Sequence, residues 1–305
     1  MCCLFGFIDY AGALSVTQKS RLIRELSIAA EVRGTDATGI AYNTSHGLQI
    51  YKRPLAAHRL HLRIPAEAHV VMGHTRMTTQ GSAKKNYNNH PFFGCVKGKR
   101  FALAHNGVLW NDLELRRTKH LPRTKVQTDS FIAVQLIEQQ KSLSLSALKC
   151  MAEQIEGSFS FSVLSEQDDL WLVKGDNPLT IVHFPAAGVY IYASTAEILN
   201  KALARCGNWL GRGDKVDIEM EDIVKIDRNG RITRGTFDAS KFYRSSWRYW
   251  DTPLYPKAPR SESEHLALLK SVAKAFGFTE EMIDRLLDQG FTTMEIEELL
   301  YDGGY

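Results

Sequence analysis

Segments typical of β-strands occur in two blocks, and a central pair of helical segments separates these blocks. The first block comprises 2–8, 40–42, 48–52, 67–74 and 101–105, and the second comprises 158–164, 170–174, 179–182, 189–193 and 223–226. Helices are expected at 18–31, where Thr17 can cap the first turn, and centrally at 128–140 and 144–155. Strands and helices that do not alternate one by one disfavour a parallel sheet. The pattern therefore predicts an α+β layered architecture, in which two antiparallel sheets sandwich helices.

The composition changes after residue 239, and we expect a domain boundary there. Residues 2–239 are expected to form the main domain. Residues 240–260 mix aromatic residues with prolines, which is typical of an irregular linker. Residues 261–305 place apolar residues at helical spacing, with capping residues at Thr279 and Thr292. This pattern predicts a small helical tail of three helices.

Composition excludes several classes of protein. The 305 residues are 44% hydrophobic and 24% charged, an ordinary globular balance, and the net charge of +4 gives no reason to favour nucleic acid. No apolar run approaches ~18 residues, so no membrane span is expected. The five cysteines are scattered without metal-ligand spacing, and we expect neither a disulfide framework nor a metal or cofactor. A reducing cytoplasm fits this cysteine usage.

The cysteine at position 2 indicates a specific chemistry. Removal of Met1 would make Cys2 the terminus, so that one residue carries both a thiol and a free α-amine. The amine titrates near ~7.7–8.0 and the thiol near ~8.5, so the amine can act as general base for the thiol. The alternative interpretation is a small buried hydrophobic residue in a first strand.

Polar residues of catalytic type occur at three junctions between predicted elements and loops. Arg76 follows the strand that ends at His74, and its guanidinium can bind a carboxylate with two N–H groups. Asn106 and Gly107 follow the strand at 101–105 and can supply two donors to an oxyanion. Asp129 is expected in the first turn of a helix, where its carboxylate can hold an ammonium group.

Each of these features also has an ordinary structural interpretation. A surface salt bridge, an Asn-Gly turn and a favourable helix dipole would explain them one at a time. Together they predict a pocket for a zwitterion next to an attacking thiol. An amino acid with a side-chain amide fits that description.

The sequence resembles the class II glutamine amidotransferases, which are N-terminal-nucleophile hydrolases. The matching motifs occur in the family's order over roughly residues 2–230: Cys2, Arg33-Gly34-x-Asp36-x-x-Gly39, Gly73-His74-Thr75-Arg76 with Thr79 and Gly81, Asn89-His90-Pro91, His105-Asn106-Gly107 and Thr128-Asp129. Two positions depart from the pattern. Met77 stands where relatives often carry an aromatic residue, and Gln80 where some carry histidine.

This resemblance implies a four-layer αββα fold and a set of site residues. It implies Cys2 as nucleophile, with Asn106 and Gly107 as oxyanion donors. The residues that it implies for glutamine binding are Arg76, Thr79, His90 and Asp129. Four further residues are expected to contact these site residues and hold them in position: Arg33, Gly34, Asp36 and His74.

The chain is too short after residue 240 for the second catalytic domain that such proteins usually carry. The expected function is a stand-alone amidotransferase or glutaminase subunit. It would hydrolyse glutamine to glutamate and ammonia through a cysteine thioester and pass the ammonia to a separate, unknown acceptor enzyme. The helical tail could dock that partner. Two alternatives stay open: an amide hydrolase of the same fold with another substrate, or a catalytically silent regulatory protein.

Overall fold

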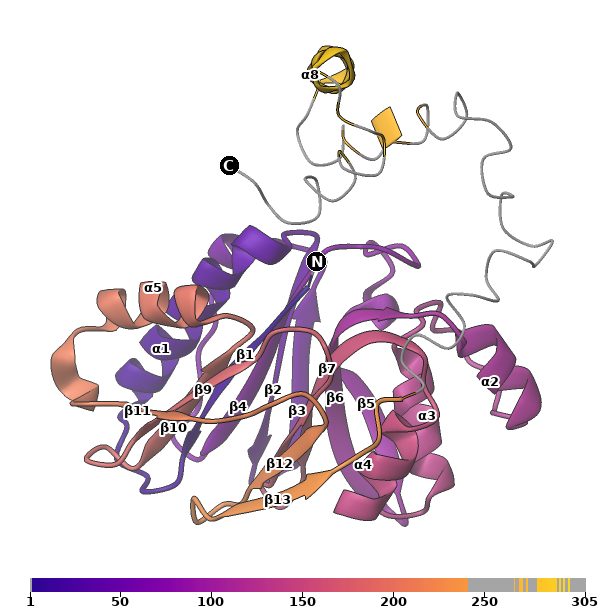
Figure 1. Ribbon diagram of the computed structural model, residues 1–305. Helices are drawn as coiled ribbons and strands as arrows, with labels where there is room; N and C mark the ends of the chain where they lie inside the picture. Colours follow the sequence, from indigo (N-terminus) through magenta and orange to yellow (C-terminus); the bar gives the residue numbers. More distant parts are fainter. Residues whose placement is uncertain are drawn as a thin grey trace. The chain divides into compact units, whose positions relative to one another are not determined.

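The computed structural model describes residues 2–240, 266, 269–270, 273, 279–289, 291, 293 and 296. The chain divides into two compact units, Met1–Ser245 and Ser246–Tyr305, and each is described here by itself. The first unit contains two β-sheets with helices on their outer faces (Figure 1).

The first sheet has seven strands in the order β11-β9-β10-β1-β4-β2-β3. Their bounds are β1 Cys3–Asp9, β2 Ala37–Thr44, β3 Gly47–Arg53, β4 Val70–Arg76, β9 Thr180–Phe184, β10 Val189–Ala193 and β11 Asp214–Val216. Every pairing in this sheet is antiparallel. The strand β1 lies between β10 and β4, so the start of the chain runs through the middle of the sheet.

The second sheet has six strands in the order β13-β12-β8-β7-β6-β5, again antiparallel throughout. Their bounds are β5 Phe92–Val96, β6 Lys99–Leu109, β7 Gly157–Ser165, β8 Leu170–Lys174, β12 Asp222–Ile226 and β13 Ile232–Thr236. The two sheets pack face to face through apolar side chains such as Leu4, Met72, Leu164 and Leu172.

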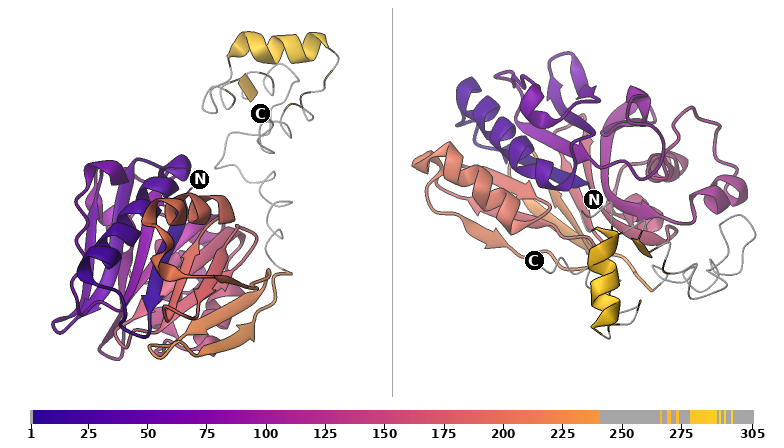
Figure 2. Two further views of the ribbon diagram at one scale, coloured as in Figure 1. Left: turned by 90° about the vertical axis from the view of Figure 1, so that its left-hand side faces the viewer. Right: turned by 90° about the horizontal axis from the view of Figure 1, so that it is seen from above.

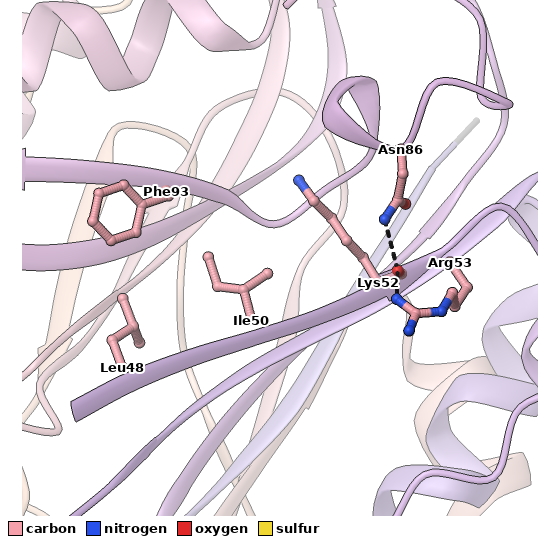
Figure 3. A pocket seen from close by; sticks show the side chains of 6 residues that line it. All are labelled: Leu48, Ile50, Lys52, Arg53, Asn86 and Phe93. Carbon is pink, nitrogen blue, oxygen red and sulfur yellow. Dashed lines mark hydrogen bonds between the residues drawn. The ribbon is translucent and has the colours of Figure 1, made fainter. Parts of the chain in front are cut away.

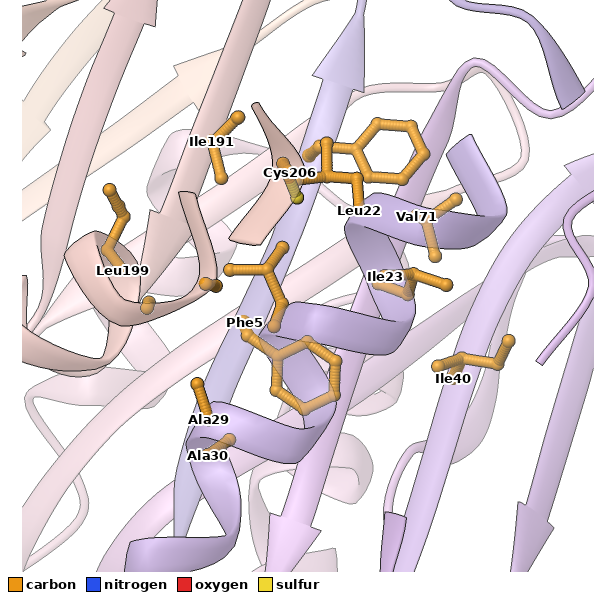
Figure 4. Close-up of a cluster of buried hydrophobic side chains, with 14 of the residues drawn as sticks. Phe5, Leu22, Ile23, Ala29, Ala30, Ile40, Val71, Ile191, Leu199 and Cys206 are labelled. Atoms are coloured by element: carbon orange, nitrogen blue, oxygen red, sulfur yellow. The ribbon is translucent and has the colours of Figure 1, made fainter. Parts of the chain in front are cut away.

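Helices cover the outer face of each sheet. Two of them, α1 (Val16–Ala29) and α5 (Ala196–Cys206), pack on the seven-stranded sheet through a core that includes Phe5, Leu22 and Leu199 (Figures 2 and 4). Two others, α3 (Phe131–Gln139) and α4 (Leu145–Ala152), pack on the six-stranded sheet. The remaining helical segments of this unit are short: α2 Asp112–Thr118, η1 Ala30–Arg33, η2 Ala57–Arg59, η3 Asn86–Asn88 and η4 Asn208–Leu210.

This architecture confirms the α+β class and the four-layer αββα sandwich. The helices lie outside the paired sheets, as the resemblance implied. The element pattern alone had suggested helices between the sheets, and that was wrong. Amphipathic helices can cover the outer faces and leave the inner faces of the two sheets to form a shared core.

Several element boundaries differ from the sequence predictions. The helix α1 is capped by Ser15, in a capping box with Gln18, and not by Thr17. Strand β6 continues through Asn106 and Gly107 to Leu109, so this Asn-Gly pair is not a turn at a strand end. The helix α3 begins at Phe131, which leaves Asp129 in the turn before it.

The second unit is described only in part. Its helix α8 (Glu280–Asp288) begins after Thr279, as predicted. Ile283 of this helix packs with Leu269, Ala273 and Ile296, which are themselves helical. The expected linker after Ser240 and most of the first and third tail helices lie outside the described residues.

Candidate active site

Cys2 lies directly before β1, at the end of the central strand of its sheet, and is 9% exposed. Its thiol donates a hydrogen bond to the Met77 carbonyl oxygen at 3.5 Å, and Arg33 Nε donates to the Cys2 carbonyl oxygen at 2.9 Å. Burial raises the pKa of the Cys2 thiol, although the Met77 contact and the charge of Arg76 act in the opposite direction. The thiol is therefore protonated at neutral pH and needs a base before it can attack.

A small, narrow cavity lies beside this thiol. It is lined by Cys2, Arg76, Met77, Thr79, Gln80, His90, His105, Gly107, Thr128, Asp129 and Ser130. Six of the seven residues predicted for catalysis or substrate binding thus line one space, although they come from distant parts of the sequence. The seventh, Asn106, does not line it.

Arg76 is the last residue of β4, and its guanidinium is held from two sides. Nη1 donates to Asn89 Oδ1 at 2.7 Å, while Nη2 donates to the carbonyl oxygens of Gln80 at 2.5 Å and Gly81 at 3.2 Å. The residue is 3% exposed, and burial lowers the pKa of its guanidinium. These contacts fix the orientation of a buried positive charge next to Cys2.

Asp129 supplies the negative charge of the cavity. Its Oδ2 accepts a hydrogen bond from the Leu109 N–H at 2.6 Å, and its own N–H donates to Gln80 Oε1 at 2.6 Å. The carboxylate is therefore bound to the end of β6 and not to the N–H groups of a helix. With Arg76, it gives the cavity one charge of each sign.

Asn106 of β6 is fully buried, and its amide contacts Ser194, which directly follows β10 of the other sheet. Asn106 Nδ2 lies 3.5 Å from Ser194 Oγ, and Oδ1 has no hydrogen-bond partner among the described residues. Ser194 Oγ also accepts from the Leu4 N–H at 2.9 Å. A buried amide oxygen without a partner is costly, which marks this side chain as one with a further function.

Three histidines lie close together at the cavity. The ring centroids of His74 and His90 are 4.1 Å apart, and those of His90 and His105 are 6.5 Å apart. Burial lowers the pKa of all three, that of His74 to about 3, so their rings are neutral near pH 7. His74 Nε2 donates to the His105 carbonyl oxygen at 2.9 Å, whereas neither ring nitrogen of His90 has a partner among the described residues.

The four residues expected to support the site lie next to the segments that carry the site residues. Arg33 binds the Cys2 carbonyl, as described above. Gly34 lies so close to Arg76 that a Cβ atom would be 2.4 Å from its carbonyl carbon. The Asp36 N–H donates to the Arg76 carbonyl oxygen at 3.0 Å, and Asp36 Oδ2 accepts from the Thr78 N–H at 2.7 Å. These contacts fix the chain on both sides of Met77.

Sequence reasoning gave no role to three residues that the structure brings into or against the site. Gln80 binds the Asp129 backbone, Asn89 binds the Arg76 guanidinium, and Ser194 binds Asn106. Gln80 and Asn89 were visible as parts of motifs, but their partners come from other segments, and only the fold shows the pairing.

The described residues contain no group of His, Cys, Asp or Glu that could hold a metal ion. None of the helices in the same part of the chain is long and apolar enough to cross a lipid bilayer. All five cysteines are free thiols.

Comparison with known proteins shows what this chain is similar to. Residues 74–201 match the sequence profile of a family described as "Glutamine amidotransferase domain". This part of the chain is thus similar to glutamine amidotransferase domains. Glutamine–fructose-6-phosphate aminotransferase of Bacillus thuringiensis subsp. konkukian is 33% identical over 190 residues, which cover 59% of this chain and 30% of the relative. The corresponding protein of Thermus thermophilus is 28% identical over 237 residues, which cover 76% and 37%.

A solved structure shares the fold of this chain. Glutamine phosphoribosylpyrophosphate amidotransferase of B. subtilis, complexed with ADP and GMP, superposes with a TM-score of 0.60 at 17% identity. The match covers 90% of this chain and 58% of that one. The chain spans only about a third of the length of the curated relatives named above.

Proposed function

We propose that this protein hydrolyses the side-chain amide of glutamine to glutamate and ammonia, through a thioester on Cys2. The observation that carries the proposal is that the Cys2 thiol, the Arg76 guanidinium and the Asp129 carboxylate line one cavity. The cavity thus offers a nucleophile together with one partner for each charged group of an α-amino acid.

The reaction begins with removal of Met1, which gives Cys2 a free α-amine. No described side chain accepts a hydrogen bond from the thiol, whose partner is the Met77 carbonyl. The neutral amine takes the thiol proton while Sγ attacks the amide carbon of glutamine. The protonated amine then gives its proton to the leaving nitrogen, so that ammonia departs and a thioester forms. Water, activated by the same amine, cleaves the thioester and releases glutamate.

The oxyanion of each tetrahedral intermediate would bind Gly107 N–H and the Asn106 side-chain amide. Ser194 Oγ already accepts from the Leu4 N–H, so its own proton is free to be donated to Asn106. If Asn106 turns its amide so that Oδ1 accepts this proton, Nδ2 takes the buried position that has no partner. An amide donor in that position needs an acceptor, and an oxyanion provides one.

Arg76 and Asp129 would bind the α-carboxylate and the α-ammonium group of glutamine. The guanidinium is held in place by Asn89 and two carbonyl groups, so the substrate does not have to order it. Thr79 and His90 line the same cavity and would contact the substrate between its two ends.

The proposal also covers the fate of the ammonia, the roles of the parts of the chain and the location of the protein. The named relatives are described as aminotransferases, so we propose that the ammonia passes to an acceptor. Residues 2–239 would form the catalytic domain and residues 240–260 a linker. The unit that contains α8 would dock the acceptor. The free cysteines support a location in the reducing cytoplasm.

The decisive experiment combines a variant with a covalent label. Cys2→Ala should abolish glutamate release while leaving the unfolding temperature unchanged, and Cys95→Ala, which removes an exposed thiol, should leave activity intact. A glutamine-mimicking electrophile should modify Cys2 alone, and the intact mass should show that Met1 is absent. Glutamate release by a folded Cys2→Ala variant, or a retained Met1 in an active preparation, would refute the mechanism.

A further inference from the structure

Lys52 connects an edge strand of one sheet to the segment that enters an edge strand of the other. It lies on β3, where Figure 3 shows its long side chain leaving the strand near Asn86. Its ammonium group donates to the carbonyl oxygens of Asn89 at 2.5 Å and Pro91 at 2.9 Å. It also lies 5.1 Å from the centre of the Phe92 ring. One cation thus contacts three residues of the short segment 89–92.

Gly39 makes this approach possible. It is the direct partner of Lys52 in the β2–β3 ladder. A Cβ atom on Gly39 would lie 2.1 Å from the His90 carbonyl oxygen and 2.8 Å from Lys52 Cβ. Any larger residue would force the segment 89–91 away from β2 and out of reach of the lysine. Gly39, the last residue of the Arg33–Gly39 motif, therefore has a structural role, because it lets the segment 89–91 approach β2.

The segment that Lys52 binds carries two residues of the active site. Asn89 Oδ1 accepts the 2.7 Å hydrogen bond from Arg76 Nη1, and the His90 ring lines the cavity beside Cys2. Lys52 itself does not line that cavity. It can affect glutamine binding through the position of this segment.

We propose that Lys52 is a positioning residue for glutamine binding, because its ammonium group fixes the segment 89–91 that orients Arg76 and His90. The proposal rests on the glutamine-hydrolysing function proposed above. Its consequence is a particular kinetic defect. Loss of the ammonium should weaken the binding of the α-carboxylate in the ground state and the transition state alike, which raises KM and leaves kcat unchanged.

The charge of Lys52 is sensitive to pH. Burial, with a smaller effect from the charge of Arg76 on β4, lowers the pKa of its ammonium to about 8. The other titratable groups that face it are His74 on β4 and His90, and burial keeps both rings neutral throughout this range. Above about pH 8 the lysine therefore loses its charge, and its two hydrogen bonds to carbonyl oxygens weaken.

The experiment compares Lys52→Met, which keeps the length of the chain without its charge, with Lys52→Arg, which keeps the charge. Lys215→Met is the matched control, because this lysine is exposed on β11. We expect Lys52→Met to raise the KM for glutamine by about tenfold or more with kcat within about twofold. Lys52→Arg should recover most of the affinity, and the control should equal the wild type.

Two further readouts separate positioning from a general loss of stability. In an Arg76→Lys background, Lys52→Met should add little to KM, because both changes act on the same contact. In the wild type, KM should rise above about pH 8, and Lys52→Arg should shift that rise to higher pH. If Lys52→Met fails to fold, the pH profiles of KM in the wild type and Lys52→Arg still test the proposal.

Several outcomes would overturn the proposal. These are an unchanged KM in a folded Lys52→Met variant, a fall in kcat alone, full additivity with Arg76→Lys, or the same pH profile in the wild type and Lys52→Arg. A wild-type protein that releases no glutamate would instead refute the function itself. The two failures are therefore distinguishable.

Discussion

At the scale of single residues, the cavity is ordered before any substrate arrives. The Nη atoms of Arg76 and a carboxylate oxygen of Asp129 already form hydrogen bonds with other residues of the protein. Such pre-ordered groups lose little conformational freedom when they bind a ligand, which increases affinity. The geometry of the guanidinium should therefore matter as much as its charge.

Arg76→Lys tests this point. We expect KM for glutamine to rise about 100-fold, because a lysine keeps the charge but cannot bind Asn89, the loop carbonyls and a carboxylate together. Steady-state glutamate release measures the effect. Arg53→Lys, a change at an exposed arginine, is the control and should be neutral. A KM that stays near the wild-type value would show that Arg76 does not bind the substrate carboxylate.

His74 makes the stability of the protein depend on pH. Its pKa is about 3 in the folded protein against 6.5 for a free histidine, so below pH 6.5 the unfolded chain takes up a proton that the folded chain does not. Stability from this group is thus complete above pH 6.5 and is lost as pH falls toward 3. Between pH 6.5 and 5 the loss should be about 2 kcal/mol.

His74→Gln should reduce this dependence, since glutamine can keep an N–H donor for the His105 carbonyl but does not titrate in this range. Urea unfolding at pH 6.5 and pH 5 measures the difference between the two proteins. The same pH dependence in both would contradict the assignment of a buried neutral ring.

At the scale of elements, a buried ion pair connects α1 to the end of β1. Lys19 Nζ lies 3.3 Å from Asp9 Oδ2, both side chains are almost fully buried, and Asp9 also accepts from the N–H groups of Ala13 and Leu14. Removing one partner leaves a charge in a medium that does not solvate it.

Lys19→Met should therefore lower the free energy of unfolding by about 3–5 kcal/mol. Chemical denaturation gives the value directly. The same substitution at exposed Lys215 should cost less than about 0.5 kcal/mol. Equal effects at the two sites would mean that the pair does not stabilise the start of α1.

The elements also show what could be predicted from the sequence. Most strands were found because their apolar runs are bounded by turn residues, as for β8 and β10. The helix α5 was missed, although Ile198, Ala202 and Cys206 recur at helical spacing after the capping residue Thr195. Strand β5 alternates buried and exposed residues over only five positions, which is too short a pattern to separate from a loop.

The sequence pointed to residues that the structure brings to one cavity, but it did not predict their contacts. Local rules interpret Asn106-Gly107 as a turn, whereas pairing with Ser160 and Phe159 of β7 keeps both residues in a strand. The partners of Lys52 and Asn106 lie 37 to 88 residues away along the chain. Such pairings depend on the order of strands in the two sheets, which no local pattern contains.

At the scale of the whole molecule, the first unit contains all the described groups that line the cavity, together with three hydrophobic clusters of its own. A protein truncated after Ser245 should therefore fold and hydrolyse glutamine with kcat and KM within about twofold of the full chain. Circular dichroism and glutamate release test this together. A folded but inactive truncation would show that the second unit takes part in hydrolysis.

The place of Cys2 at the head of a central strand has a practical consequence for producing this protein. A purification tag fused before it would replace the free amine with a peptide bond beside the cavity that Cys2 lines. Protein tagged in this way should be inactive until a protease removes the tag and exposes Cys2. A tag at the C-terminus leaves the thiol and the amine of Cys2 unmodified.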